Sequence, residues 1–269
     1  MLRISGVGVS HVGLVRSGNE DAGFVGPTCM LVADGVGGAA AGEVAAATTA
    51  YIVSAVALID SSADPGATLR AGVRMAQEQL ATGVRQDPAR AGMATTLTAL
   101  ATDGERFALA HLGDSRGYLL REGALRRVTT DHTYVQRLID EGSLPASAAA
   151  DHPWRNVVLR SVNGTLEEVG EIHAVDLRPD DRVLLASDGL TDLVEDERIE
   201  EILLRHDDDA AAHALVDEAL ALGGRDNVTC VLGTIIEGPE VVSDGLLVGA
   251  LRDPWNIVDP AAVRMPHTA

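Results

Sequence analysis

The 269-residue sequence contains no lysine, and all 21 of its basic residues are arginine. Phosphate-binding loops of the Walker A type require a lysine, and Schiff-base enzymes and protein kinases depend on one as well. The absence of lysine therefore excludes these classes of enzyme.

Cysteine is scarce, with only Cys29 and Cys230 in the chain. Both lie in short apolar segments, CMLVA and VTCVLGTI, where cysteine is typically a small buried hydrophobic residue. Neither is followed by the arginine-ended loop that a cysteine phosphatase uses, and no CxxC pair indicates zinc or a redox centre. We expect no catalytic role for either thiol.

Long apolar runs are also missing. The N-terminal segment MLRISGVGVSHVG lacks the basic region followed by an apolar one that marks a signal peptide. The longest apolar stretch, from Ala50 to Ile59, is too short to cross a bilayer. These features predict a cytoplasmic protein.

Positive charge is in deficit, because the formal net charge is −19. Affinity for phosphate backbones and anionic lipids comes largely from lysine and arginine, so we expect neither nucleic acid nor a membrane as a partner. Metal cations and proteins are the expected partners. The length and the 46% of apolar residues fit one large domain with a substantial core.

Hydrophobic periodicity and turn signals predict a sheet core with helices around it. Strands are expected at 3–15, 29–33, 95–101, 107–112, 117–120, 125–128, 171–177, 182–186 and 228–236, with the four between 95 and 128 forming an antiparallel meander. Helices are expected at 39–59, 67–86, 133–141, 197–205 and 209–222.

Two segments fall outside this core. Residues 131–170 begin with a helical pattern and continue through the turn His152-Pro153-Trp154, which indicates an excursion from the sheets. Residues 239–269 are only loosely patterned, so we expect a mobile tail after a catalytic domain of residues 1–238.

Aspartates follow or precede the predicted strands at four places, Asp34, Asp114, Asp188 and Asp226. Neighbouring antiparallel strands end and begin at a shared edge, so these four side chains can face one cleft. Carboxylate and carbonyl oxygens are hard ligands that suit Mg²⁺ or Mn²⁺. The alternative is that Asp-Gly pairs merely mark turns, and those at Asp103 and Asp244 fit that interpretation.

Six motifs in one order resemble the signature of the metal-dependent protein phosphatases, the protein phosphatase 2C (PPM) family, and particularly its bacterial members. The resemblance covers about residues 3–236, and its motifs are RSGNED (16–21), DGVGG (34–38), ATTL (94–97), GDSR (113–116), SDG (187–189) and DNVT (226–229). It implies an α+β fold, a four-layer α/β/β/α sandwich of two antiparallel sheets flanked by helices. It also implies hydrolysis of phosphoserine and phosphothreonine in proteins by in-line attack of a hydroxide that bridges two metal ions.

The resemblance assigns ligands to two tightly held Mn²⁺ or Mg²⁺ ions and a weaker third. Asp34 corresponds to the carboxylate that bridges the pair, and Gly35 lends its backbone carbonyl. Asp188 and Asp226 correspond to ligands of the second ion. Asp114 would hold the third ion together with Asp188.

Further roles follow from the same resemblance. Glu20 and Asp21 would orient metal-bound water, and Asn227 lies in the same motif as Asp226. Arg16 corresponds to the guanidinium that binds phosphate, a role suited to its planar fork and permanent charge. A surface salt bridge is the alternative for Arg16.

One position departs from the family pattern. Some members carry a histidine directly after the Asp-Gly pair as a candidate general acid, whereas this chain has Val36. Metal-bound water or another residue must then protonate the leaving oxygen, and His132 and His152 are candidates. The segment 131–170 resembles the bacterial flap beside the active site; the alternative is a helical insertion that merely caps the sheet.

Two rival functions remain. Residues 35–40 imitate the glycine motif of dinucleotide-binding folds, but Asp34 would then oppose the pyrophosphate and the later aspartates would stay unexplained. The other rival is a pseudophosphatase or weakly active partner-switching regulator of the same fold, which would be marked by lost ligands. The favoured prediction is a phosphatase that opposes a Ser/Thr kinase or acts on its targets.

Overall fold

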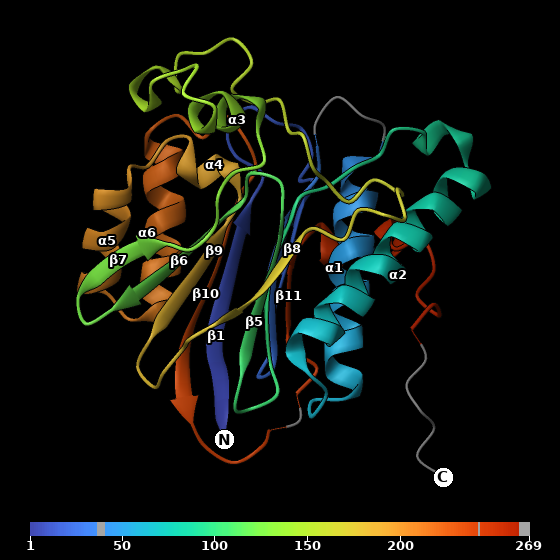
Figure 1. The fold of residues 1–269 in the computed structure, drawn as a ribbon, viewed down its shortest axis with the longest axis horizontal. Coiled ribbons are helices and arrows are strands. Elements are labelled where there is room, and N and C mark those ends of the chain that lie inside the picture. Colours follow the sequence, from blue (N-terminus) through green and yellow to red (C-terminus); the bar gives the residue numbers. More distant parts are fainter. Residues whose placement is uncertain (37–40, 242, 264–269) are drawn as a thin grey trace.

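The computed structural model describes residues 1–36, 41–241 and 243–263. In this part of the chain, two antiparallel sheets pack face to face between helices, which gives four layers (Figure 1). The first sheet has the spatial order β1 (Leu2–His11), β10 (Val228–Glu237), β9 (Arg182–Ala186), β6 (Arg116–Arg121) and β7 (Ala124–Arg127). The second has the order β11 (Leu246–Gly249), β2 (Asp21–Val25), β3 (Cys29–Asp34), β4 (Leu97–Thr102), β5 (Phe107–Leu112) and β8 (Glu171–Val175). The predicted α/β/β/α sandwich is confirmed.

Helices cover both outer faces. The six-stranded sheet packs against α1 (Gly42–Ile59) and α2 (Pro65–Gln86), and the five-stranded sheet against α4 (Asp188–Thr191), α5 (Asp196–Arg205) and α6 (Asp208–Ala221). Local sequence sets the starts of two of them. Asp64 accepts a hydrogen bond from the Ala67 N–H at 2.9 Å, with Pro65 at the first helical position, and Asp207 accepts one from the Ala210 N–H at 2.9 Å.

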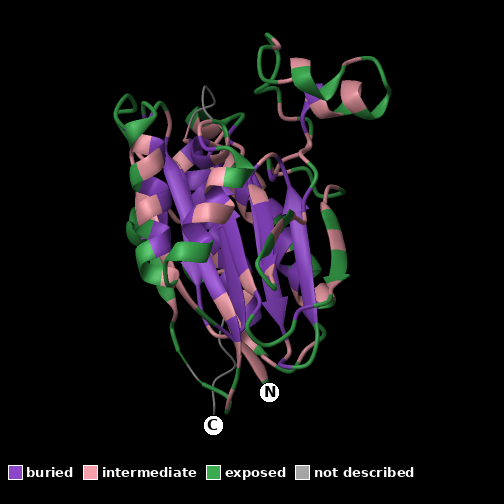
Figure 2. Cartoon of the chain, turned by 90° about the vertical axis from the view of Figure 1, so that its left-hand side faces the viewer, coloured by how far each residue is buried: buried purple, intermediate pink, exposed green. Residues whose placement is uncertain are grey.

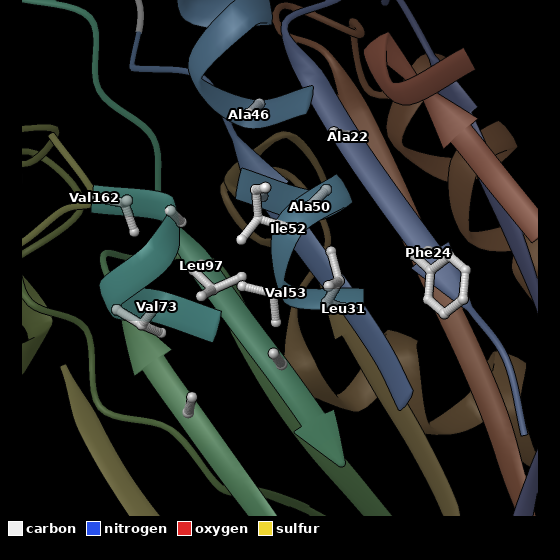
Figure 3. Packing of buried hydrophobic residues seen from close by; sticks show 14 of the residues in the cluster. Ala22, Phe24, Leu31, Ala46, Ala50, Ile52, Val53, Val73, Leu97 and Val162 are labelled. Carbon is white, nitrogen blue, oxygen red and sulfur yellow. The ribbon is translucent and has the colours of Figure 1, made fainter. Parts of the chain in front are cut away.

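Helix α1 is long and apolar enough to cross a membrane by length and composition alone, with a mean hydropathy of 1.6. In the fold, however, 67% of it is buried, and it packs against β2, β3 and α2. Ala46, Ala50, Ile52 and Val53 lie in one cluster with Leu31 and Leu97 of the sheet (Figure 3). The apolar surface of α1 is therefore buried in the protein core.

Most strands are buried (Figure 2), whereas the edge strands β7 and β8 are partly exposed. Apolar side chains pack on both faces of each sheet. The space between the sheets contains residues of both, among them Val32, Leu100, Leu185 and Val231. Each such fully buried aliphatic side chain stabilises the fold by roughly 1.5–3 kcal/mol. The core thus fixes the two sheets against each other, and with them the strand ends that carry the aspartates.

The predicted meander of residues 95–128 is wrong at one connection. Strands β4 and β5 pair in the six-stranded sheet, whereas β6 and β7 pair in the five-stranded one, so the chain crosses between sheets after β5. The crossing begins at Gly113, whose φ of +104° is one that side-chain-bearing residues rarely adopt. As a result Asp114 lies at the boundary of the two sheets.

The C-terminal segment also departs from prediction. Residues 246–249 form β11, which pairs antiparallel with β2, and Ala250 and Leu251 enter the core beneath α1. The Tyr51 hydroxyl then donates a hydrogen bond to the Pro260 carbonyl at 2.7 Å. The prediction of a mobile tail is therefore wrong for residues 246–263, and the domain does not end at residue 238. Residues 242 and 264–269 of that prediction lie outside the described residues, as do residues 37–40 of the DGVGG motif and the predicted 39–59 helix.

The segment 131–170 lies at one end of the sandwich, above the sheets in Figure 1, and much of its surface is exposed (Figure 2). It contains α3 (Tyr134–Asp140) and an internal bridge, Thr133↔Val158, and a second bridge, Thr95↔Val162, joins it to the six-stranded side. Short 3-10 turns complete the chain: η1 (Pro88–Arg90), η2 (Ala146–Ala148), η3 (Ala250–Arg252) and η4 (Pro254–Asn256).

Candidate metal centre

A polar cavity of about 340 Å³ opens where β3, β5 and β9 end and β10 begins. Eight of the nine predicted site residues line it, and the ninth, Asp21, is fully buried at the start of β2. The lining residues are Arg16, Ser17, Gly18, Glu20, Asp34, Gly35, Val36, Thr96, Asp114, Asn156, Val158, Asp188, Asp226 and Asn227. The fold thus brings together motifs that are up to 210 positions apart.

Asp34 is the last residue of β3, and hydrogen bonds fix its backbone. Its N–H donates to Thr96 Oγ1 at 3.0 Å, and its carbonyl accepts from the Thr96 N–H and the Thr95 hydroxyl, both at 2.8 Å. Gly35 follows in a space that admits no side chain, since a Cβ there would lie 2.6 Å from backbone atoms of Gly42. The fold therefore requires glycine at position 35, and Asp34 and Gly35 are also a candidate pair of metal ligands.

The loop that carries Asp114 is held from the six-stranded side. The hydroxyls of Ser115 and Thr96 are 2.7 Å apart, and the Thr98 hydroxyl donates to the Ser115 carbonyl at 2.9 Å. Thr96 therefore forms hydrogen bonds both to Asp34 and to the loop that carries Asp114. The sequence motif pointed to residues 94–97, but only the structure gives Thr96 this double contact.

Asp188 and Asp226 are brought together by the adjacent strands β9 and β10. Asp188 is the first residue of α4, and a Cβ on Gly189 would lie 1.9 Å from the Asn227 carbonyl oxygen, so only glycine fits. Asn227 holds the loop between β1 and β2, which carries Arg16, through three hydrogen bonds. Its Oδ1 accepts from the Glu20 N–H at 2.7 Å, and its Nδ2 donates to the carbonyls of Val12 and Gly18.

The carboxylates repel one another strongly. Burial raises the pKa of Asp34 well above its ordinary range, and the charges of Asp21, Asp188 and Asp114 raise it further. The pKa of Asp188 is raised well above its ordinary range by burial and then by Asp114. Burial also raises the pKa of Asp114 to about 7. Such a cluster stays ionised at neutral pH only if positive charge is supplied.

Arg16 supplies one such charge. Its Nη2 lies 2.6 Å from Asp226 Oδ2, with the two side chains 44% and 37% exposed. A pair this exposed is worth about 0–1 kcal/mol. The guanidinium predicted to bind phosphate thus lies against a carboxylate predicted to bind metal.

The donor set fits divalent cations. Four carboxylates and the Gly35 carbonyl are hard oxygen donors of the type that Mg²⁺ and Mn²⁺ prefer. Two buried carboxylate oxygens beside the cavity, Glu20 Oε2 and Asp21 Oδ1, have no hydrogen-bond partner in the described part of the chain. Buried polar atoms are normally satisfied, so these two are free for water or a cation.

The carboxylates that line the cavity stand apart from one another. Over residues 1–36, 41–241 and 243–263, no three carboxylate, imidazole or thiolate groups stand in a ready coordination sphere. The mutual repulsion of the carboxylates and the Arg16–Asp226 pair are consistent with this open arrangement.

Neither candidate histidine lines the cavity. His132 Nδ1 accepts from the Gly113 N–H at 3.2 Å, its Nε2 lies 3.3 Å from Glu171 Oε1, and its ring centroid is 4.7 Å from that of His111. His152 Nδ1 accepts from the Trp154 N–H at 3.1 Å. Their placement does not support a role as general acid. The segment 131–170 instead contributes Asn156 and Val158 to the cavity, which the sequence motifs did not single out.

The sequence profile described as Protein phosphatase 2C matches residues 17–220. The chain belongs to this family. As a member of the phosphatase 2C family, it is 40% identical over 264 residues to the serine/threonine protein phosphatase PstP of Mycobacterium tuberculosis, a match over 97% of this chain and 49% of that protein. It is 33% identical to the serine/threonine phosphatase stp of Listeria welshimeri, over 82% of this chain and 91% of that protein.

Solved structures of the family have the same fold. The crystal structure of the M. tuberculosis PstP/Ppp phosphatase superposes with a TM-score of 0.81 at 41% identity, covering 87% of this chain and 100% of that one. The PstP catalytic domain in complex with two manganese ions gives a TM-score of 0.79 at 40% identity, covering 88% and 100%. This phosphatase 2C chain spans about half the length of the full PstP relatives that it matches.

Proposed function

We propose that this chain is a Mn²⁺- or Mg²⁺-dependent phosphatase that hydrolyses phosphoserine and phosphothreonine in proteins. The observation that carries the proposal is the convergence of Asp34, Asp114, Asp188 and Asp226 on one cavity that Arg16 also lines. Family membership and the two manganese ions of the PstP catalytic domain support it. Phosphorylated proteins, including a Ser/Thr kinase or its targets, are the proposed substrates.

In this proposal each residue keeps the role that the family resemblance implies. Asp34 and the Gly35 carbonyl hold one ion, with Asp34 shared between the pair, and Asp188 and Asp226 hold the other. Asp114 and Asp188 hold the weaker third. When bound, these ions supply the positive charge that the acidic cavity lacks and make water acidic enough to attack phosphorus at neutral pH.

The protein's own groups bind and orient the substrate. The Arg16 guanidinium offers parallel N–H donors to two phosphate oxygens. Asn227 fixes the backbone at Gly18 and Glu20, which sets the loop that carries Arg16 at its place on the rim. Glu20 and Asp21 would accept hydrogen bonds from water at the metal centre and so orient it. Among the described residues that line the cavity, none forms a nucleophile of the serine–histidine or cysteine type, so direct attack by water agrees with the lining.

The pseudophosphatase alternative requires that ligands be lost. All five predicted ligand residues are present and line the cavity. We further propose a cytoplasmic location, because protein kinases draw ATP from the cytoplasm and their products are the proposed substrates.

The test is hydrolysis of a phosphothreonine peptide in Mn²⁺ and in chelator, by the wild type and by Asp188→Asn. We expect no activity in chelator and at least a hundredfold loss of kcat in Asp188→Asn, since a metal ligand is removed. Asp244→Asn, which changes an exposed Asp-Gly aspartate away from the cavity, is the matched control and should keep full activity. Full activity in chelator would overturn the proposal.

A further inference from the structure

Behind the cavity, the carboxylate of Asp21 is held by one oxygen and free at the other. Asp21 pairs in register with Asp34 across β2 and β3, and its side chain is fully buried. The Ser187 hydroxyl lies 2.7 Å from Oδ2 and donates to it. Oδ1 has no hydrogen-bond partner among the described residues. The fixed oxygen therefore determines where the free one points.

The direction of the Ser187 hydrogen bond is itself fixed. Its Oγ accepts from the Thr229 N–H at 2.9 Å, so its single proton is directed to Asp21. Ser187 follows β9 and directly precedes Asp188. One buried hydroxyl thus connects the carboxylate of Asp21 to the backbone that carries a predicted metal ligand.

A second series of hydrogen bonds begins at the backbone of Asp21. The Asp21 N–H donates to Asn19 Oδ1 at 3.1 Å, which orients the amide so that its Nδ2 donates to Ser10 Oγ at 2.9 Å. The hydroxyls of Ser10 and Thr229 are 2.8 Å apart. Because the Thr229 N–H also donates to Ser187 Oγ, this series closes a ring of hydrogen bonds from the backbone of Asp21 to its carboxylate.

The C-terminal segment closes over these groups. Gly249, at the end of β11, has a φ of +63°, and a Cβ there would lie 3.0 Å from Ser10 Oγ and 2.1 Å from the Asp21 carbonyl oxygen. A side chain at position 249 would therefore not fit between β11 and these hydrogen-bonded groups. Ser187 and Thr229 are fully buried, and in such surroundings hydrogen bonds to a carboxylate are stronger than in water.

We propose that Ser10, Thr229 and Ser187 are positioning residues that hold Asp21 so that its free oxygen serves the metal centre. Ser10, Thr229 and Ser187 belong to the five-stranded side and Asp21 to the six-stranded side, so the network also joins the two sheets at the cavity. The inference rests on the proposed function, in which Asp21 orients water on the bound ions. A merely structural network would stabilise the fold without changing affinity for metal.

The test compares Thr229→Val, which removes the hydroxyl at nearly constant volume, with Thr229→Ser, which keeps it. We expect Thr229→Val to weaken Mn²⁺ binding roughly tenfold, as loss of an outer partner of a metal site typically does. Isothermal titration calorimetry measures this directly, without any turnover. Phosphopeptide kinetics should show a lower kcat at unchanged KM, and Thr229→Ser should restore both quantities to near the wild-type values.

Thr234→Val is the matched control, because it removes a hydroxyl bonded to the Asp208 carboxylate farther along the same strand. It should bind Mn²⁺ like the wild type. If Thr229→Val does not fold, Ser10→Ala at the partly exposed end of the network takes its place, with Ser10→Thr as its rescue.

Wild-type Mn²⁺ affinity in the folded Thr229→Val variant would contradict the inference, and so would a Thr229→Ser variant as impaired as Thr229→Val. Failure of the proposed function would look different, because the wild type itself would then bind no Mn²⁺ or hydrolyse no phosphopeptide.

Discussion

Arg16 can pair either with the carboxylate of Asp226 or with a bound phosphate. It pairs with Asp226 at 2.6 Å at the rim of the cavity, and hydrogen bonding to Asp226 raises the pKa of the guanidinium above its ordinary value. The pair is exposed enough to exchange partners at little cost. A cation on Asp226 and a phosphate on Arg16 would replace one weak ion pair by two stronger contacts.

Arg16→Ala should raise KM for a phosphothreonine peptide about tenfold to a hundredfold, since hydrogen bonds to charged groups contribute about 1.5–3 kcal/mol. Mn²⁺ affinity should stay unchanged or increase, because Asp226 loses a competing cation. Arg16→Lys should recover only part of the loss, as lysine lacks the planar fork. Steady-state kinetics and calorimetry measure the two effects, and unchanged kinetics in Arg16→Ala would assign Arg16 to structure.

At this scale the sequence predicted which residues meet, but not their contacts. Aspartates beside strand ends and the order of six motifs pointed to the residues of one cavity. The Arg16–Asp226 pair could not be predicted, because it depends on which neighbours compete for a charge once the chain is folded. The same is true of His132, whose ring is turned toward Gly113 and Glu171.

Among the elements, the C-terminal segment was the least predictable. Strand β11 has only four residues, and two of them, Leu246 and Leu247, are each 41% exposed, so its pattern shows no clear alternation. It forms because β2 offers a free edge, which is a property of the folded sheet. The crossing after β5 was missed for a similar reason, since short apolar runs do not reveal their strand partners.

Leu251→Ala should lower the free energy of unfolding by about 2–5 kcal/mol, because it leaves a cavity beneath α1. Leu251 is 2% exposed, whereas Trp255, four residues later, is 87% exposed. Trp255→Ala is therefore the control and should change stability by about 0.5 kcal/mol or less. Urea unfolding followed by circular dichroism measures both variants, and equal stabilities would mean that the segment is detached in solution.

For the molecule as a whole, the acidic cavity opposes folding when no metal is present. The pKa of Asp114 is raised to about 7 in the folded chain from its ordinary 3.8, chiefly by burial and then by Asp131. The folded state therefore binds more protons than the unfolded state between these values, and the contribution of Asp114 to stability falls as pH rises through this window.

Asp114→Asn should consequently stabilise the metal-free protein relative to the wild type. The difference in the free energy of unfolding should grow from about pH 4 and reach its full size above about pH 7. Comparing the two proteins cancels the titrating groups that Asp114 does not perturb, including His111, whose pKa is lowered to about 3 by burial and which acts in the opposite direction. Removal of the Asp114 charge also relieves the raised pKa of Asp34 and Asp188, which increases the same difference in stability. Thermal melting in chelator across this pH range measures the difference. A stability difference between the two proteins that shrinks as pH rises would contradict the raised pKa of Asp114.

In the proposed function, carboxylates at the strand ends of two packed sheets form a two-metal centre. The most direct measurement is anomalous diffraction from crystals grown with Mn²⁺. We predict two manganese peaks in the cavity, both adjacent to Asp34, with one of them also bound by Asp188 and Asp226. Absence of manganese from the cavity, or a peak that none of these three carboxylates touches, would rule out the proposed two-metal centre.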